Sequence, residues 1–259
     1  MSAFDLTGKV AVVTGGNGGI GLGIAEGLAE AGCAVHVWGR SAEKNERALQ
    51  MLRAKGARAA AALCDVGDSA SVEAAFGEAL ATFGRVDGCF ANAGVYGSGA
   101  RSFLERPLEE WRRVMTTNLE GVILTLQAAA RHMVERSKLG DAGGRLVVTS
   151  SLASLYGTAR NEHYAASKAA LNALARALAV EFARYGITSN AVVPGWITTE
   201  MTEGLFANAR FVEAVKPRIP LRRFGEPADF AGIAVYLMSA ASSYHTGDLF
   251  VIDGGYTLF

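Results

Sequence analysis

Two side chains in the run Tyr-Ala-Ala-Ser-Lys, Tyr164 and Lys168, have types and spacing suited to proton transfer. Four positions are slightly more than one helical turn, so in a helix both side chains lie on one face. A free tyrosine has a pKa of about 10 and is a poor base near neutrality, but a nearby ammonium favours the phenolate and lowers that pKa. The pair therefore predicts a general acid or base, Tyr164, whose pKa is lowered by Lys168.

A serine at the end of a predicted strand adds to this pair. Ser151 follows the apolar run 145–150, and the carboxyl ends of strands in open α/β sheets are where ligands bind. A hydroxyl there can hydrogen-bond a substrate carbonyl and hold it for protonation. Ser150 is the neighbouring alternative, and we expect its side chain to face away from the site.

The elements that position these residues are short apolar strands that alternate with Ala-rich helices. The strands lack polar alternation, which is typical of parallel strands buried on both faces. Their alternation with helices predicts right-handed crossovers and an α/β Rossmann fold, a doubly wound, mostly parallel seven-stranded sheet with helices on both faces. Strands are expected over 10–14, 34–38, 57–64, 86–91, 145–150, 188–193 and 249–252, and helices over 20–31, 42–55, 70–83, 108–136 and 164–185.

The sequence shows no repeat, no low-complexity tract and no linker rich in Pro or Gly. We therefore expect a single Rossmann-type domain over residues 1–259. The stretch from about 198 to 226 breaks the alternation of strands and helices. It predicts a small substrate lid of short helices and loops.

A glycine-rich turn links the first expected strand to the first expected helix, with Gly15, Gly19 and Gly21 after Thr14. Glycines allow a tight turn and a close approach of the backbone to a pyrophosphate. The helix N-terminus then offers free N–H groups and the positive end of a dipole. The turn predicts a dinucleotide cofactor.

The second expected strand ends at Gly39-Arg40, where NAD-selective sites place a carboxylate for the ribose 2′-hydroxyl. No acid stands there; Gly39 leaves room for a phosphate and Arg40 can pair with it. We therefore favour NADP(H) over NAD(H). Asn17 and Gly18 supply no second basic residue in the glycine turn, which weakens this preference.

Taken together and in this order, the motifs resemble those of the short-chain dehydrogenase/reductase (SDR) family, and of its 3-oxoacyl-ACP reductase-like members of about 250 residues. The resemblance covers essentially the whole chain. Its segments are Thr14-Gly15-x-x-x-Gly19-x-Gly21, Asn92-Ala93-Gly94, Asn118, Ser151, Tyr164-x-x-x-Lys168, Pro194-Gly195 and Ile252-Asp253-Gly254-Gly255. Ala91 departs from the usual Asn-Asn-Ala-Gly pattern of the family.

The resemblance implies a catalytic set of Asn118, Ser151, Tyr164 and Lys168. Tyr164 would exchange a proton with the substrate oxygen, and Ser151 would position that oxygen. Lys168 would lower the pKa of Tyr164 and bind the nicotinamide ribose. Asn118 would support a water that links Lys168 to solvent.

The resemblance also implies a set of cofactor-binding positions. Asp65 and Val66 would contact adenine, and Pro194, Ile197 and Thr199 would hold the nicotinamide and its carboxamide. Asp65 has an alternative interpretation as a residue that only begins a helix. With Tyr164 and Lys168, the set comprises Gly15, Asn17, Gly19, Ile20, Gly21, Arg40, Asp65, Val66, Asn92, Gly94, Pro194, Ile197 and Thr199.

The amino-acid composition limits the classes of partner that the protein is expected to bind. Lys and Arg together number 25, as do Asp and Glu, so no net field favours nucleic acid or an anionic membrane. Three widely spaced cysteines suggest reduced thiols and no zinc site, and we expect no metal. The first residues lack the pattern of a signal peptide, and no apolar run is long enough to span a bilayer. We expect a cytoplasmic protein.

The hypothesis is thus an NAD(P)(H)-dependent oxidoreductase, an alcohol dehydrogenase or carbonyl reductase that interconverts a secondary alcohol and a ketone. The alternatives are a catalytically silent, cofactor-binding regulatory protein and a dehydratase or epimerase on the same fold.

Pocket loops without conspicuous charge favour a neutral, partly apolar small-molecule substrate. Surface charge is the preferred interpretation of Arg101 and Arg160, although either could bind an acid. The apolar C-terminal segment favours a homotetramer, with a dimer as an alternative.

Overall fold

The computed structural model describes residues 3–97 and 102–258. Its seven strands form one sheet in the order β3-β2-β1-β4-β5-β6-β7, and each of the six strand pairings is parallel. The strands are β1 (Val10–Thr14), β2 (Ala34–Gly39), β3 (Ala59–Leu63), β4 (Gly88–Ala91), β5 (Gly144–Thr149), β6 (Ile187–Pro194) and β7 (Leu249–Ile252). The predicted seven-stranded Rossmann sheet is confirmed, and its strand order reverses between β1 and β4.

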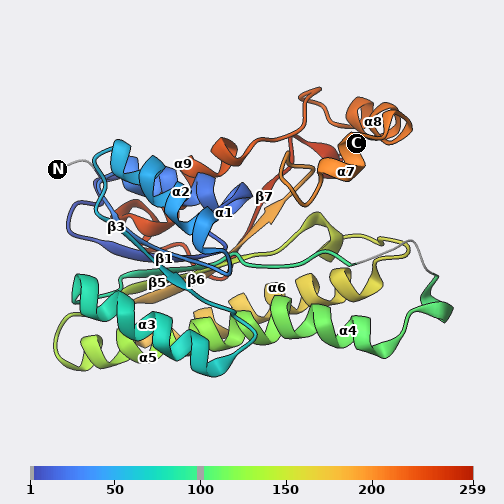
Figure 1. Ribbon diagram of the computed structural model, residues 1–259. Helices are drawn as coiled ribbons and strands as arrows, with labels where there is room; N and C mark the ends of the chain where they lie inside the picture. Colours follow the sequence, from blue (N-terminus) through green and yellow to red (C-terminus); the bar gives the residue numbers. More distant parts are fainter. Residues whose placement is uncertain (1–2, 98–101, 259) are drawn as a thin grey trace.

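Helices cover both faces of the sheet (Figure 1). One face carries α1 (Gly19–Glu30), α2 (Ala42–Ala54) and α9 (Ala231–Met238); the other carries α3 (Ser69–Phe83), α4 (Leu108–Met115), α5 (Gly121–Lys138) and α6 (Glu162–Phe182). Strands β1, β2, β4 and β6 are buried along their whole length, as expected for strands covered on two sides. Apolar side chains from the sheet pack into a separate core on each face.

Helix α9 is missing from the sequence-based prediction. Its sequence, AGIAVYLM, is apolar almost throughout and shows no amphipathic period. The helix lies against α1, where a Cβ on Gly27 would come within 2.6 Å of Ala231 Cα. Close packing between these two helices explains both the small residues and the absence of a polar face.

Two further expectations need correction at helix boundaries. The helix expected over 108–136 contains a π-helical turn, η2 (Thr116–Glu120), between α4 and α5. The helix expected over 70–83 begins one residue earlier, at Ser69, and is capped by Asp68, whose carboxylate accepts a hydrogen bond from the Ala70 amide at 3.0 Å. A π-turn leaves no mark on hydrophobic periodicity, which is why a single helix was expected there.

The segment after β6 contains two short helices, α7 (Glu203–Phe206) and α8 (Ala209–Val215). Both helices fall within the stretch from about 198 to 226, whose role as a substrate lid stays a prediction. They stand beyond the end of the sheet, near the C-terminus (Figure 1). Among the described residues, no helix is long and apolar enough to cross a membrane.

Candidate active site

A cleft of about 700 Å³ opens at the carboxyl ends of the strands, where doubly wound sheets bind their ligands. Most of the predicted site residues line it. They are Gly15, Asn17, Gly19, Ile20, Arg40, Asp65, Val66, Asn92, Gly94, Ser151, Tyr164, Lys168, Pro194, Ile197 and Thr199. Gly21 and Asn118 do not line the cleft, and each lies directly behind a residue that does.

The glycine turn is shaped for close backbone approach. Gly15 and Gly19 have φ values of 63° and 49°, which L side chains rarely adopt. A Cβ on Gly21 would lie 2.2 Å from the Gly15 carbonyl oxygen, so Gly21 supports the turn from behind. Gly18 precedes α1 with no side-chain cap. The first amides of α1 are therefore free for an anion, and the turn fits the pyrophosphate of a dinucleotide.

Asn92 braces the same turn from β4. Its side-chain amide donates to the Thr14 carbonyl at 3.1 Å, and its backbone N–H donates to Thr14 Oγ1 at 3.0 Å. These bonds join the two strands at the point where the strand order reverses. Asn92 is thus both part of the cleft wall and a support for the glycine turn.

At the adenosine end of the cleft, Arg40 is exposed and its side chain has no ion pair or hydrogen bond among the described residues. Lys44, on α2, also lines this end, and the sequence analysis missed it. Lys44 Nζ lies 2.5 Å from a carboxylate oxygen of Glu200, which belongs to the loop after β6. Two cationic side chains therefore lie at this end of the cleft, and one of them is paired with an acid.

The interpretation of Gly39 needs correction. A Cβ there would lie 2.0 Å from Asn17 Nδ2 and 2.6 Å from Asn45 Oδ1, so side-chain amides fill the space expected for a phosphate. Asn17 donates to Asn45 at 2.7 Å, and buried Asn45 donates to the carbonyls of Gly39 and Ala62. Glycine is required here because these amides join the glycine turn to α2 and β3.

Asp65 and Val66 follow β3 and line the cleft as expected for an adenine-binding pair. The Asp65 carboxylate accepts a hydrogen bond from the Gly67 amide at 3.0 Å, while Asp68 caps α3. The backbone N–H of Asp65 also donates to Ser71 Oγ on α3 at 3.0 Å, so this residue both lines the cleft and bonds the start of the helix. Its contact with adenine stays a prediction.

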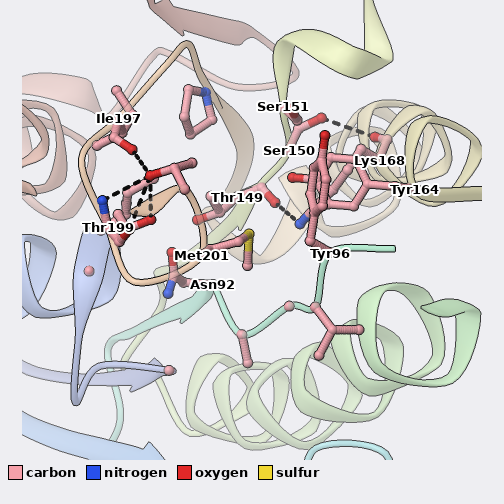
Figure 2. A pocket seen from close by; sticks show the side chains of 18 of the residues that line it. Asn92, Tyr96, Thr149, Ser150, Ser151, Tyr164, Lys168, Ile197, Thr199 and Met201 are labelled. Carbon is pink, nitrogen blue, oxygen red and sulfur yellow. Dashed lines mark hydrogen bonds between the residues drawn. The ribbon is translucent and has the colours of Figure 1, made fainter. Parts of the chain in front are cut away.

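Ser151, Tyr164 and Lys168 come together on one side of the cleft (Figure 2). Lys168 is almost fully buried, and its Nζ donates to the Thr149 carbonyl at 2.7 Å. The same nitrogen lies 5.7 Å from the centroid of the Tyr164 ring. Ser150 Oγ donates to the Lys168 carbonyl at 3.0 Å, but Ser150 also lines the cleft, so the expectation that it faces away from the site is wrong.

Burial controls the protonation of this pair. It raises the pKa of Tyr164 to about 12; neighbouring Tyr96 adds to the rise, and a hydrogen bond with Ser151 opposes it. Burial also lowers the pKa of Lys168 to about 8. The pKa shift of Tyr164 is therefore upward, and the lowering effect expected from Lys168 stays a prediction. A raised pKa favours the neutral phenol, which is a proton donor.

Asn118 lies in the π-helical turn and is fully buried. Its amide oxygen accepts from the Val95 N–H at 2.7 Å, and its nitrogen donates to the Val95 carbonyl and to Ser167 Oγ. A Cβ on Gly94 would lie 3.2 Å from Asn118 Oδ1 and 3.4 Å from Lys168 Nζ. Asn118 thus fixes the loop after β4 beside the lysine. Its support of a water stays a prediction.

The loop that carries Ile197 and Thr199 forms the opposite side of the pocket (Figure 2). Thr202 stabilises it, because its hydroxyl donates to the Ile197 carbonyl at 2.6 Å and accepts from the Thr199 amide at 3.0 Å. With Pro194, this loop gives a fixed backbone surface facing Tyr164. The arrangement fits the flat nicotinamide end of a dinucleotide.

Several aromatic side chains complete the substrate end, and the sequence analysis did not predict most of them. The Tyr96 ring centroid is 4.9 Å from that of Tyr164, and Tyr156, Trp196 and Tyr256 also line the cleft. Trp196 belongs to the loop after β6 and packs against Tyr256 within this group. Hydrophobicity alone marks none of these residues, since they lie in loops without periodicity.

Several neighbouring side chains lie away from the cleft. Phe206 stacks on Phe224 with ring centroids 4.0 Å apart, and Phe211 packs edge-on against Trp196. His163 is buried beside Glu110 and does not line the cleft. Arg160 is exposed and does not line the cleft; Arg101 lies outside the described residues.

Comparisons with known proteins agree with this geometry. A family model described as enoyl-(acyl carrier protein) reductase matches residues 15–257. The chain is 35% identical to a 2-dehydro-3-deoxy-D-gluconate 5-dehydrogenase of Escherichia coli, covering 99% of this chain and 98% of the relative. The chain belongs to the short-chain dehydrogenase/reductase family.

Two further relatives show the range of substrates named in this family. An L-rhamnose 1-dehydrogenase (NAD(P)(+)) of Sphingomonas is 35% identical and covers 96% of both chains. The crystal structure of a gluconate 5-dehydrogenase from Burkholderia cenocepacia, in complex with NADP and tartrate, is 35% identical. It superposes with a TM-score of 0.92 over 99% of this chain and 98% of that chain. This SDR protein is an NAD(P)(H)-dependent oxidoreductase that interconverts a secondary alcohol and a ketone, and nothing found supports a silent regulatory protein.

Proposed function

We propose that this SDR enzyme acts on a polyhydroxy acid, prefers NADP(H), and uses Tyr164 as its general acid and base. The observation that carries the chemistry is the position of Tyr164 beside Ser151 and Lys168, in a cleft that also contains the glycine turn. The bound nicotinamide would supply a hydride to the substrate carbon, or accept one from it. The side chains of the protein must then bind the substrate oxygen and donate or accept its proton.

In the direction of reduction, the Ser151 hydroxyl hydrogen-bonds the carbonyl oxygen and holds it near the Tyr164 phenol. Tyr164 donates its proton as the oxygen becomes an alkoxide, and in oxidation it accepts that proton back. Lys168, with a pKa lowered to about 8, can exchange protons near neutral pH and replace the one that Tyr164 loses. Burial suits this exchange, because it brings the pKa of the lysine closer to neutrality.

The positions assigned to cofactor binding follow from the same cleft. The free amides of α1 after Gly18 would hold the pyrophosphate, and Asp65 and Val66 would border the adenine. Pro194, Ile197 and Thr199 would hold the nicotinamide opposite Tyr164. Asn118 acts from behind, by fixing the loop next to Lys168.

Support for the substrate class comes from the relatives. The Escherichia coli and Burkholderia cenocepacia proteins are named for gluconate derivatives, and the second was crystallised with tartrate, which is itself a hydroxy acid. The decisive test is oxidation of a panel of hydroxy acids, neutral sugars and apolar alcohols, followed by the absorbance of the reduced cofactor. We expect turnover with hydroxy acids. Turnover only with neutral or apolar alcohols would overturn the substrate class and restore the expectation of a neutral substrate.

Support for NADP(H) comes from Arg40, which has no partner among the described residues, and from the absence of an acid at the end of β2. Replacing Arg40 by Ser should reduce kcat/KM for NADP⁺ by about 10- to 100-fold, the value of one charge-assisted contact. Use of NAD⁺ should change little. The matched control is Arg47→Ser on α2, the helix that follows Arg40, where Arg47 pairs with Glu43 and does not line the cleft. Better kcat/KM with NAD⁺ in the unaltered enzyme would contradict the preference.

A cytoplasmic location and a homotetramer, with a dimer as the alternative, remain proposals. The second has some support in exposed apolar side chains near the C-terminus, including Val251 and Leu258. Phe259 lies outside the described residues. Sedimentation of the purified protein tests the oligomeric state directly.

A further inference from the structure

One cation at the substrate end of the cleft is unused by the proposed chemistry. Arg218 lies in the short turn after α8, is exposed, and lines the same cleft as Tyr164. Its side chain makes no ion pair and no hydrogen bond to any residue between 3 and 97 or between 102 and 258. An arginine at the edge of a cleft without a carboxylate partner can bind an anion from solution.

The position of the guanidinium is fixed by an aromatic support. The Arg218 Cζ lies 4.7 Å from the ring centroid of Tyr256, which is itself buried. Tyr256 packs in turn against Tyr156 and Trp196, with ring centroids 6.1 and 6.3 Å away. Stacking on a ring keeps the five N–H donors at the guanidinium edge free for a ligand.

The backbone beneath Arg218 is also held. Gly254 and Gly255 have φ values of 66° and 90°, and a Cβ on either would come within 2.9 Å of Ile219 or Pro220. The Leu221 amide donates to the Gly254 carbonyl at 3.2 Å. The turn after α8 is therefore packed directly on the segment that follows β7, and Arg218 is presented from a supported position.

The other charged groups in the described lining of the cleft have other functions. Arg40, Lys44, Asp65 and Glu200 belong to the cofactor end, and Lys44 pairs with Glu200. Lys168 is bonded to the Thr149 carbonyl and belongs to the proton chemistry. No acidic side chain among the described lining residues stands at the substrate end; Asp253 lies behind the lining and its charge acts on Tyr156, as does that of Arg218.

We propose that Arg218 is a carboxylate-binding residue, which receives the acid group of the substrate while its hydroxyl or keto carbon lies at Ser151 and Tyr164. This inference rests on the proposed function and identifies the residue that selects a hydroxy or keto acid. Arginine can hold a carboxylate by two parallel hydrogen bonds, which fixes orientation as well as affinity. A neutral sugar of the same size gains nothing from this contact.

The test uses D-gluconate and D-gluconamide, which have the same hydroxyl groups and differ in the charge of the terminal group. We expect Arg218→Gln to lower kcat/KM for gluconate by about 10- to 100-fold, mostly through KM, because it removes a charge-assisted contact. The value for gluconamide should change by less than about twofold. Arg218→Lys should retain part of the gluconate activity, since lysine keeps the positive charge but lacks the two parallel N–H donors of the guanidinium.

Arg184→Gln is the matched control. Arg184 is also exposed and stacks on a tyrosine, with its Cζ 4.8 Å from the Tyr185 ring, but it does not line the cleft. Its replacement should leave both substrates unaffected. Gluconate turnover that is equal in the unaltered enzyme and in Arg218→Gln would overturn the inference and leave the proposed function intact. Gluconamide turnover without gluconate turnover in the unaltered enzyme would overturn the proposed substrate class, and the carboxylate site with it.

Discussion

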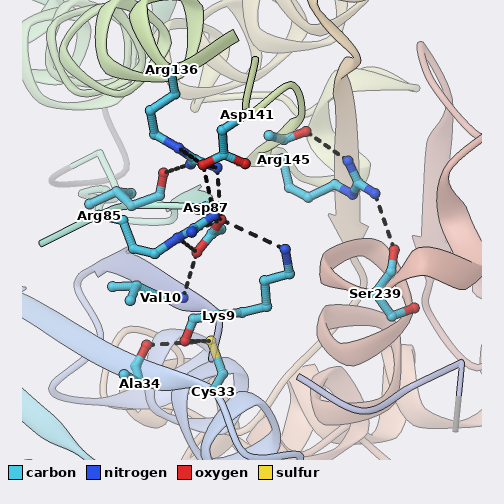
Figure 3. Close-up of polar contacts among 12 residues, drawn as sticks. Lys9, Val10, Cys33, Ala34, Arg85, Asp87, Arg136, Asp141, Arg145 and Ser239 are labelled. Carbon is cyan, nitrogen blue, oxygen red and sulfur yellow. Dashed lines mark hydrogen bonds and ion pairs between the residues drawn. The ribbon is translucent and has the colours of Figure 1, made fainter. Parts of the chain in front are cut away.

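Charged side chains lie at both ends of the strands, here called the amino-terminal and carboxyl-terminal edges of the sheet. They differ in whether these side chains have partners of opposite charge. At the amino-terminal edge, buried Asp87 is surrounded by cations: Arg85, Arg136 and Lys9 lie 2.5, 3.2 and 3.8 Å from its carboxylate (Figure 3). Its second oxygen accepts from the Val10 amide at 3.0 Å. Asp87 and these cations are thus paired, and the groups join β1, β4 and α5. Arg145, at the same end of the strands, donates only to the carbonyls of Gly144 and Ser239.

At the carboxyl-terminal edge, the charges lack such partners. Lys168 is buried with only a neutral carbonyl as its hydrogen-bond acceptor, and Arg40 and Arg218 have no acid beside them among the described residues. The difference shows that a charged side chain alone does not indicate a site. A buried charge with complete partners supports the fold, while one without them is available for a ligand or a proton.

Replacing Asp87 by Asn tests the amino-terminal edge, and of the predictions made here it should have the largest effect on stability. The change leaves Arg85 and Arg136 facing a neutral group in a buried position, and breaking a buried pair costs about 3–5 kcal/mol. We expect a loss of about 3 kcal/mol in the free energy of unfolding, measured by urea denaturation. The kcat of the folded variant should stay within about twofold of the unaltered enzyme, because Asp87 lies at the far edge from the cleft.

Glu78→Gln is the control for this measurement, since Glu78 is an exposed acid on α3 whose carboxylate has no ion pair among the described residues. It should change the free energy of unfolding by less than about 0.5 kcal/mol. An Asp87→Asn variant as stable as this control would show that the paired edge does not stabilise the fold.

Replacing Lys168 by Met should do the opposite of the Asp87 substitution. It should abolish turnover and change the free energy of unfolding only slightly. Burial lowers the pKa of Lys168 from 10.5 to about 8. The unfolded chain therefore binds more protons than the folded one between these values, so this lysine destabilises the fold at neutral pH and less so as pH rises. We expect the variant to lose turnover while its free energy of unfolding at pH 7 stays equal or rises by about 1 kcal/mol.

Comparing the two proteins between pH 7 and pH 10 sharpens this prediction. Any stability advantage of Lys168→Met should shrink as pH rises through about 8, because the folded lysine then becomes neutral. A variant that is less stable than the unaltered enzyme by more than about 2 kcal/mol would show that Lys168 serves the fold, like Asp87.

The strands, the glycine turn and the catalytic motif could be predicted because each is encoded by residues close together in sequence. The apolar run of β1 and the Tyr-x-x-x-Lys spacing are local patterns, and both agree with the structure. The failures concern contacts between distant segments. The Asn17–Asn45 bond explains Gly39 and spans 28 positions, and Lys44 meets Glu200 across 156 positions.

The protonation of Tyr164 could not be predicted for a similar reason. Its spacing from Lys168 indicates a lowered pKa, but the direction depends on how deeply both side chains are buried. Arg218 gave no signal either, because only the folded chain brings the turn after α8 beside Tyr256. Sequence thus predicts which groups can react, and packing decides their charge and their partners.

The most direct test of the catalytic edge is kcat and cofactor affinity in Tyr164→Phe. Removing one hydroxyl leaves the ring in place beside Tyr96, so NADPH affinity, followed by fluorescence, should stay within about threefold of the unaltered enzyme. The kcat should fall by about 10³-fold, since general acid–base catalysis contributes about 10²- to 10⁴-fold. A kcat within about tenfold of the unaltered enzyme would contradict the assignment of Tyr164 as the proton donor and acceptor.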